Sequence, residues 1–245
     1  MKGIAFSARN SKEILRDPLN IAFGLGFPLI LLFLLTAIQS NIPVSIFEIE
    51  RLAPGLAVFG LSFISLFSAT LISKDRGSSF LLRLFASPLT AADFIIGYTL
   101  PLFPIAIGQS AICFAASAFL GLEINFGVVL SLIVLIPTAI FFIAVGLLAG
   151  SLLNDKQVGG ICGALLTNLC AWLSGTWFDL DLVGGAFKKI AYALPFVHGV
   201  DAAKAAISGE YQNIMPHLWW VIGYAFGTLV LAVFVFSRKM KSDSK

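Results

Sequence analysis

Uncharged polar side chains inside long apolar stretches are the groups of this sequence that could bind or react with another molecule. A hydroxyl or amide at membrane depth can hydrogen-bond a neighbouring helix or a molecule that passes by. Bonds between helices explain most such groups, and the remainder are candidates for a path taken by an amphipathic molecule. Together with two aromatic neighbours, these candidates are Ser62, Ser65, Thr167, Asn168, Ser174, Trp172 and Phe178.

Asp, Glu, Lys and Arg are all absent from the cores of the six longest apolar stretches. Ion-coupled carriers keep such groups at mid-membrane, so their absence argues against proton- or sodium-driven transport. No constellation of Ser, Asp and His at depth could activate a nucleophile, and we therefore expect no catalytic residue. Cys113, Cys162 and Cys170 lack the spacing of metal ligands, so we expect them to pack as apolar side chains and predict no metal site.

The composition indicates that lipid is the solvent for most of the chain. Hydrophobic residues make up 58% of the 245 residues and charged residues 12%, and mean hydropathy is +0.95. This leaves too little polar surface to coat a soluble protein. A helix needs about 20 apolar residues to cross a bilayer. Six stretches predict such helices, over residues 21–38, 53–72, 94–120, 127–153, 158–178 and 218–236. We therefore predict an all-α polytopic membrane protein, with residues 1–245 forming a single transmembrane domain.

Lysine and arginine are unevenly divided between the two sides of the predicted membrane. With an even number of spans, 12 of the 16 Lys and Arg residues fall on the side of both termini and 4 on the other side. Positively charged loops are retained in the cytoplasm, so we predict cytoplasmic N- and C-termini in the plasma (inner) membrane of a prokaryote. The first span has too long an apolar core for a cleavable signal peptide, and we expect it to stay in the mature protein.

Two segments on the predicted cytoplasmic side have an amphipathic pattern. Residues 74–90 are longer than a simple turn requires and predict a basic helix across the inner face, either a second membrane anchor or a lever that contacts a partner. Residues 1–17 predict a helix that lies along the membrane surface, as an anchor for anionic lipid or as a docking surface. Its predicted apolar face consists of Ile4, Ala8, Ser11 and Leu15.

Glycines and prolines inside the spans predict how the helices pack. Gly146 and Gly150 have the spacing that lets two helices approach closely, as have Gly223 and Gly227, and we expect packing within one bundle. Prolines remove backbone donors and kink helices, so we expect kinks at Pro101, Pro104 and Pro137.

Short motifs follow one another along the chain in a fixed order. They are Pro54-Gly55-Leu56, Asp75-Arg76-Gly77, Leu82-Arg83-Leu84, Ser87-Pro88-Leu89 and Leu173-Ser174-Gly175, followed by Pro195. The motifs between 74 and 90 are the most specific, because their combination in register seldom arises by chance. With these motifs the sequence resembles the ABC-2 class of ABC transporter permeases, the six-span subunits of drug and polysaccharide exporters, over essentially its whole length.

This resemblance implies a division of labour between subunits. Two copies of a separate ABC ATPase subunit, which holds ATP and Mg²⁺, would drive two permease subunits in membrane lipid, which form a homodimer or pair this chain with a similar subunit. The sequence agrees, because it has no Gly-x-x-x-x-Gly-Lys-Ser/Thr phosphate loop. We expect no cofactor in this chain and no nucleic-acid partner. The helix within 74–90 would be a coupling helix that contacts the ATPase through Asp75, Arg76, Gly77, Arg83, Leu84, Phe85, Ser87 and Pro88.

The resemblance also implies that residues 179–210, which hold no stretch long enough to span, form short re-entrant outer helices. Irregular backbone is tolerated at that depth only where protein buries it or water lines it. Gly184, Gly185, Pro195 and Gly199 fit such broken helices.

The leading hypothesis is a permease subunit, not itself an enzyme, that exports an amphipathic or hydrophobic substrate. A drug, an antibiotic, a lipid and a lipid-linked glycan all remain open as substrates. The alternative from another class is a non-transporting membrane scaffold or sensor that recruits a cytoplasmic partner through the same inner-face helices. An ion-coupled carrier is a third alternative, against which the uncharged spans argue.

Overall fold

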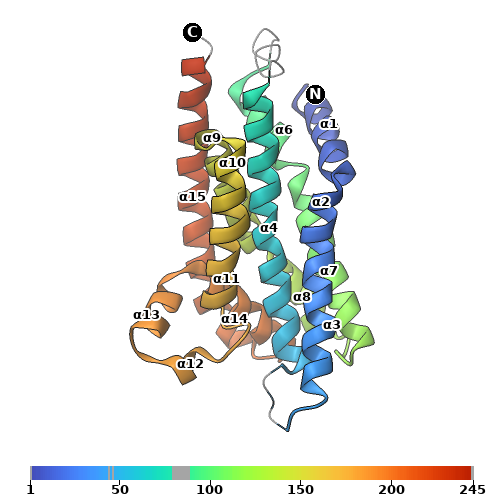
Figure 1. The fold of residues 1–245 in the computed structure, drawn as a ribbon. Coiled ribbons are helices and arrows are strands. Elements are labelled where there is room, and N and C mark those ends of the chain that lie inside the picture. Colours follow the sequence, from blue (N-terminus) through green and yellow to red (C-terminus); the bar gives the residue numbers. More distant parts are fainter. Residues whose placement is uncertain (1, 44, 46, 79–88, 244–245) are drawn as a thin grey trace.

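A computed structural model describes residues 2–43, 45, 47–78 and 89–243, and every regular element in these ranges is a helix (Figure 1). Most helices run along one common direction and form a bundle. Helix α1 and the C-terminal end of the last helix lie at one end of this bundle, and a group of short helices lies at the opposite end. This arrangement confirms the all-helical membrane fold that the sequence predicts.

The first half of the bundle consists of α1 (Lys2–Arg16), α2 (Pro18–Ile21), the π-helix η1 (Ala22–Gly26), α3 (Phe27–Gln39), α4 (Ile49–Gly77), α6 (Ala91–Thr99) and α7 (Leu102–Phe119). The second half consists of α8 (Phe126–Val134), α9 (Ile136–Leu152), α10 (Asp155–Val158), the π-helix η2 (Gly159–Leu166), α11 (Thr167–Leu173), α12 (Leu180–Val183), α13 (Gly185–Ala193), α14 (Pro195–Ile207), the 3-10 helix η3 (Tyr211–Asn213) and α15 (Ile214–Asp243).

Five helices among the described residues are long and apolar enough to cross a membrane: Ala22–Gln39, Ile49–Gly77, Ala92–Phe119, Phe126–Leu152 and Tyr211–Lys239. They correspond to five of the predicted spans. The predicted span over 158–178 is not among them. Its place is taken by α10, η2 and α11, which follow one another and pack against α4 (Figure 1). The count of six spans therefore stays a prediction.

Helix α4 forms the centre of the bundle. It packs against helices from both halves of the chain, including α3, α7, α9, η2, α11 and α14, and most of its residues are buried. The predicted span ends at residue 72, but the helix continues to Gly77. The first three residues of the predicted coupling motif, Asp75, Arg76 and Gly77, therefore belong to this central helix.

The helices are interrupted at two of the predicted prolines. Thr99 ends α6 and Leu102 begins α7 around Pro101, and Leu135 separates α8 from α9 shortly before Pro137. Pro101 has no N–H to donate to the carbonyl four residues earlier, that of Gly97. The side-chain Nδ2 of Asn10 donates to this Gly97 oxygen instead, at 2.9 Å. The break in one helix therefore becomes an attachment point for α1.

The face of α1 that packs on the bundle differs from the predicted apolar face. Ile4 and Leu15 are 63% and 56% exposed, whereas Phe6, Asn10 and Ile14 are buried. Asn10 lies on the buried face because it bonds the free Gly97 carbonyl, and the predicted apolar face is left exposed on the outside of the bundle. That the exposed face meets the membrane surface stays a prediction.

Residues 179–210 contain the short helices α12, α13 and α14 at the end of the bundle opposite α1 (Figure 1). Gly184 separates α12 from α13 at a φ of 61°, which favours glycine. Pro195 begins α14, a position that suits proline because its N–H has no helical partner. Gly199 does not break α14. A Cβ there would lie 2.9 Å from Thr138 Oγ1, so this glycine permits close packing on α9.

The two glycine pairs behave differently. A Cβ on Gly146 would lie 2.7 Å from the Ser65 carbonyl oxygen, and one on Gly150 would lie 2.9 Å from that of Ala69. This pair therefore lets α9 pack closely on α4, as predicted. A Cβ on Gly223 or Gly227 of α15 would meet no described atom within 4 Å, so the prediction that this pair packs within the bundle is wrong for this chain.

This difference supplies a matched test of the α4–α9 contact. We expect Gly146→Ala to lower the free energy of unfolding by about 1–3 kcal/mol, because the new methyl group would press on α4 backbone. Gly227→Ala, in an open helix face, should instead raise stability by up to about 1 kcal/mol through helix propensity. Thermal melting of both variants in the same detergent measures this. Equal melting temperatures would contradict the proposed contact.

Candidate functional site

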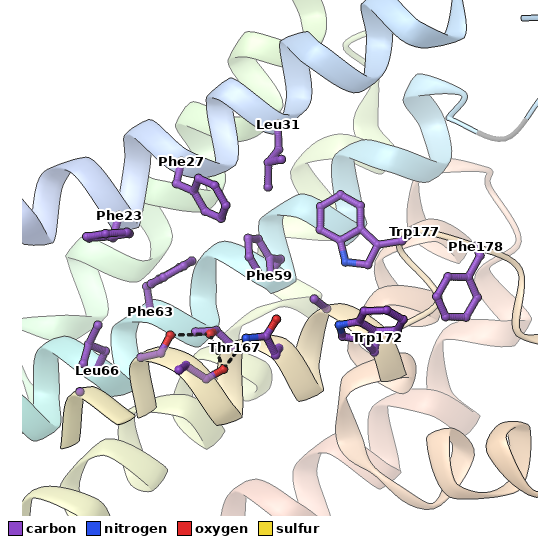
Figure 2. A pocket seen from close by; sticks show the side chains of 15 residues that line it. Phe23, Phe27, Leu31, Phe59, Phe63, Leu66, Thr167, Trp172, Trp177 and Phe178 are labelled. Carbon is purple, nitrogen blue, oxygen red and sulfur yellow. Dashed lines mark hydrogen bonds between the residues drawn. The ribbon is translucent and has the colours of Figure 1, made fainter. Parts of the chain in front are cut away.

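A cavity of about 700 Å³ lies between the η1–α3 segment, α4 and the η2–α11 segment (Figure 2). These elements bring together the first, second and fifth predicted spans. The cavity is lined by Phe23, Phe27, Leu31, Phe59, Phe63, Leu66, Gly159, Gly163, Ala164, Thr167, Asn168, Ala171, Trp172, Trp177 and Phe178. None of these side chains is charged. The cavity therefore suits a guest with a large apolar body and few polar groups.

Aromatic rings form most of one wall. Phe59 and Phe63 are one helical turn apart on α4, so they share one face, and their rings meet edge to face at 5.4 Å. Trp177 contacts Phe59 at 5.7 Å, and Phe27 lies 5.9 Å from Phe59 across the helix interface. Figure 2 shows these rings turned towards the same space. Such an array offers both ring faces and ring edges to an aromatic guest.

Polar groups enter the cavity from the junction between η2 and α11. Thr167 Oγ1 donates to the carbonyl oxygen of Gly163 at 2.6 Å, and Asn168 Nδ2 donates to that of Ala164 at 2.8 Å. A π-helix shifts the usual backbone pairing, and it occurs often at functional sites. Here the two side chains bond carbonyls one turn earlier, where the π-helix gives way to the α-helix. Among the described residues, no donor bonds Asn168 Oδ1, so it can accept a hydrogen bond from a guest.

The structure brings together some of the predicted path residues and separates others. Thr167, Asn168, Trp172 and Phe178 line the cavity. Three serines lie outside it and are fully buried, namely Ser62, Ser65 and Ser174. The Ser62 and Ser65 hydroxyls each donate at 2.6 Å to a carbonyl three residues earlier on α4, and Ser174 bonds Thr176 at 2.6 Å. Their polar groups are thus satisfied within the protein and not directed at the cavity.

Sequence reasoning missed the aromatic wall. Phe23 with Phe27 and Phe59 with Phe63 are pairs at the helical spacing of four residues, which was the available signal. Such pairs are common in any apolar helix, however, because apolar rings also pack against lipid or core. Only the packing of η1 and α3 against α4 shows that the two pairs face one another.

A second candidate site lies at the far end of α4, where three helices meet at one buried carboxylate. Asp75 is 3% exposed. Arg9 on α1 donates to both of its oxygens, from Nη1 at 2.9 Å and from Nη2 at 3.2 Å. Tyr98 on α6 donates its hydroxyl to Asp75 Oδ2 at 3.0 Å. A bidentate guanidinium with an additional hydroxyl is a strong arrangement for a buried carboxylate. We call Arg9, Asp75 and Tyr98 the three-helix junction.

Further contacts hold α1 against α6 around this junction. The Gly3 N–H donates to Asp93 Oδ1 at 3.2 Å, and Phe6 packs edge to face on Tyr98 at 5.0 Å. Arg9 also pairs with Glu13 at 2.5 Å on its own helix. The N-terminal helix is therefore fixed to α4 and α6 by specific contacts, in addition to any contact with lipid.

The predicted coupling residues fall into two groups. Arg76 donates from Nη1 to the carbonyl oxygen of Gly150 at 2.9 Å, which satisfies a free carbonyl at the end of α9. Asp75 and Arg76 thus point into the protein, and Gly77 is exposed at the end of α4. The remaining predicted contact residues lie outside the described residues, namely Arg83, Leu84, Phe85, Ser87 and Pro88.

One continuous helix joins the junction to the cavity. Phe63 lines the cavity and Asp75 is 12 residues further along α4, a separation of roughly 18 Å at 1.5 Å per residue. Between Phe63 and Asp75 no helix break separates the aromatic wall from the junction.

Comparison with protein families decides the class. Residues 3–207 match the family described as ABC-2 type transporter. The chain belongs to this family. The match includes both the aromatic cavity and the three-helix junction. A comparison with curated proteins gives no match.

Membership identifies this ABC-2 chain as the transmembrane subunit of an ABC exporter, and not as the ATPase. ABC-2 permeases typically work with an ABC ATPase. The membrane-spanning helices agree with this class, since at least five of them are long enough to cross a bilayer.

Proposed function

We propose that this permease exports an amphipathic or hydrophobic substrate from the cytoplasm or the inner leaflet, and that the aromatic cavity is part of the path. The observation that carries this proposal is the combination of an uncharged aromatic wall with a volume of about 700 Å³, which lies in the range of drug-sized binding sites. Aromatic antibiotics and drugs fit this chemistry best. A lipid or lipid-linked glycan would bind through its apolar part.

Energy for export comes, in this proposal, from ATP and Mg²⁺ held by two copies of a separate ATPase subunit. The segment between Gly77 and Leu89 joins α4 to α6, the two helices that meet α1 at the three-helix junction. Closure of the ATPase dimer would push on this segment. Because α4 continues without a break into the cavity wall, the push would shift the cavity between inward-open and outward-open populations.

A second copy of the chain would complete the path. Trp172 and Phe27 both line the cavity, and their side chains are 57% and 38% exposed. Because these large rings are exposed at the cavity edge, one side of the cavity is not covered by this chain. In this proposal a homodimer partner covers that side. In this proposal the membrane is the plasma membrane of a prokaryotic cell and both termini lie in the cytoplasm; the excess of Lys and Arg on the side of the termini, 12 of 16 residues, supports this orientation.

The proposal is tested by purifying the tagged chain after coexpression with candidate ABC ATPase subunits of the same organism and by reconstituting the complex in liposomes. We expect the ATPase to copurify, and we expect an uncharged aromatic probe such as N-phenyl-1-naphthylamine to stimulate ATP hydrolysis and to move between leaflets with ATP. If no ATPase copurifies and ATP hydrolysis never responds to such probes, the chain is instead a scaffold or sensor.

A pair of exposed tryptophans provides a matched test of the cavity. Trp172 lines it, whereas Trp219 is 63% exposed on α15 and lies outside it. We expect Trp172→Ala to weaken binding of the aromatic probe about fivefold to tenfold, since an aromatic contact contributes about 1 kcal/mol. Trp219→Ala should leave binding unchanged. Probe fluorescence titrated against each reconstituted variant measures this, and equal affinities would exclude Trp172 from the binding site.

A further inference from the structure

The two histidines of the sequence lie in contact at the end of the bundle opposite α1. His198 lies on α14 and His217 on α15, and their Nδ1 atoms are 2.9 Å apart. His198 is 5% exposed. Its other ring nitrogen, Nε2, is 3.0 Å from the carbonyl oxygen of Tyr192, and the ring of Trp220 stacks on it at 5.2 Å with an interplanar angle of 2°. This contact ties α14 directly to the first turns of α15.

The hydrogen-bond network determines which nitrogens carry hydrogen. A carbonyl oxygen can only accept, so His198 Nε2 must carry a hydrogen and donate to Tyr192. In the neutral pair, His198 Nδ1 is then the acceptor and His217 Nδ1 is the donor. In the neutral pair, one hydrogen therefore lies between the two Nδ1 atoms.

The number of protons that this pair can hold is limited. One added proton is tolerated, because His198 can then donate from Nδ1 to a neutral His217 whose Nδ1 accepts. A second proton gives both Nδ1 atoms a hydrogen and leaves no acceptor between them. The two imidazolium rings would also repel each other at this distance. The contact therefore exists for the neutral and the singly protonated pair and breaks for the doubly protonated pair.

Other ionisable groups around His198 do not remove this limit. On α14 itself, Asp201 acts on His198 by its charge, but its carboxylate accepts from the Tyr192 hydroxyl at 3.4 Å and lies 4.0 Å from Lys204 Nζ. The elements that pack on α14 contain further ionisable side chains, among them His217 and Tyr224 on α15, Tyr192, Lys188 and Lys189 on α13, Glu50 and Arg51 on α4, Cys170 on α11, and Tyr211 on η3. Of these, His217 and Tyr192 contact His198. Helices α8 and α9, which also pack on α14, contain no ionisable side chain.

We propose that the His198–His217 pair is an acid-released latch, which holds α14 against α15 at neutral pH and releases it when both rings are protonated. The latch lies at the end of the bundle that the sequence predicts to be extracytoplasmic, so it would respond to the pH outside the cell. Release would loosen the outer helices α13 and α14, where substrate is expected to leave. This last consequence rests on the proposed export function, but the latch itself does not.

The direction of the pH effect follows from burial. Burial lowers the pKa of His198 from its ordinary value, because desolvation disfavours the charged ring. A His with a lowered pKa binds protons less readily in the folded protein than in the unfolded chain. Its contribution to stability is therefore present above the ordinary His pKa of about 6.5 and decreases as the pH falls below that value.

Two substitutions at His217 separate the latch from other effects of acid. Asparagine places an amide near the position of Nδ1 and can donate or accept, so His217→Asn should keep the bond and make it independent of pH. Phenylalanine keeps the ring shape without a polar atom, so His217→Phe should lose the bond at every pH. Spectroscopy and melting of these variants need neither ATPase nor substrate, so failure of the latch and failure of the export function remain distinguishable.

The first measurement is NMR of the full chain labelled with ¹⁵N-histidine in lipid nanodiscs. Because the sequence has two histidines, only two rings contribute signals. We expect a coupling between the two Nδ1 atoms at pH 7.5 and its loss at pH 5.0. The second is thermal melting, where the wild type should lose about 3 °C more than His217→Asn between these pH values. His217→Phe should melt below the wild type at pH 7.5 and match it at pH 5.0. A coupling that persists at pH 5.0, or equal pH dependence of wild type and His217→Asn, would overturn the proposal.

Discussion

Replacing Arg9 with alanine is expected to cost about 2 kcal/mol of stability and to uncouple ATP hydrolysis from export. The substitution leaves the Asp75 carboxylate buried, with the Tyr98 hydroxyl as its one remaining side-chain donor among the described residues. Removing one partner of a fully buried ion pair costs roughly 3–5 kcal/mol. The expected cost is lower because the Arg9 side chain is 36% exposed, so water screens part of its charge.

A double-substitution cycle distinguishes the buried pair from a general effect on α1. In Arg9→Ala with Asp75→Asn, no unpaired buried charge remains, so we expect at least half of the lost stability to return. Lys12→Ala is the matched control, because Lys12 lies on the same helix and is exposed. Melting temperatures in one detergent measure all five proteins, namely the wild type, the single variants Arg9→Ala and Asp75→Asn, the double variant and Lys12→Ala. A loss at Lys12→Ala as large as that at Arg9→Ala would mean that the junction is not the cause.

The functional part of this prediction follows from the position of the junction. Arg9, Asp75 and Tyr98 tie α1, α4 and α6 together within two residues of the end of α4. Without the Arg9–Asp75 contact, a push on the segment after Gly77 would move that end of α4 relative to α1 instead of moving the helices as one unit. We expect the reconstituted Arg9→Ala complex to keep most of its ATP hydrolysis while transporting probe at about one fifth of the wild-type rate or less.

The sequence was sufficient to predict the helical membrane fold, because run length and charge pattern act locally. A stretch such as 53–72 is apolar for longer than a soluble helix needs, and this identifies it without knowledge of its neighbours. The proline breaks were also predictable, since Pro101 lacks a donor in any context. The full length of α4 was not, because Asp75 and Arg76 are charged and were expected in a loop.

Features that depend on contacts between distant residues could not be predicted in this way. Arg9 and Asp75 are 66 residues apart in the chain, and each is an ordinary surface-type residue when considered alone. The π-helix η2 has no sequence signature comparable to that of a capped α-helix, yet it helps to place Thr167 and Asn168 at the cavity. The predicted role of Ser62 depended on its polarity, whereas its hydroxyl bonds its own helix.

Filling the cavity with an indole is expected to reduce export at least tenfold. Ala164 lines the cavity on η2, and its side chain is exposed to that space, so Ala164→Trp can extend into the cavity without displacing the core. An added ring would occupy the region that an aromatic substrate needs, between η2 and the Phe59–Phe63 wall. A loss of about 1.4 kcal/mol of binding free energy is tenfold in affinity.

Leu165 offers the control for this substitution, because it is the next residue on the same π-helix, is 57% exposed and does not line the cavity. Leu165→Trp adds an indole to the same element outside the cavity, so it should transport the probe at the wild-type rate. Both variants are expected to copurify with the ATPase and to hydrolyse ATP without substrate. Transport of N-phenyl-1-naphthylamine by the two reconstituted complexes decides the matter: equal rates would show that the substrate passes elsewhere, and loss in Ala164→Trp alone would place it in the cavity.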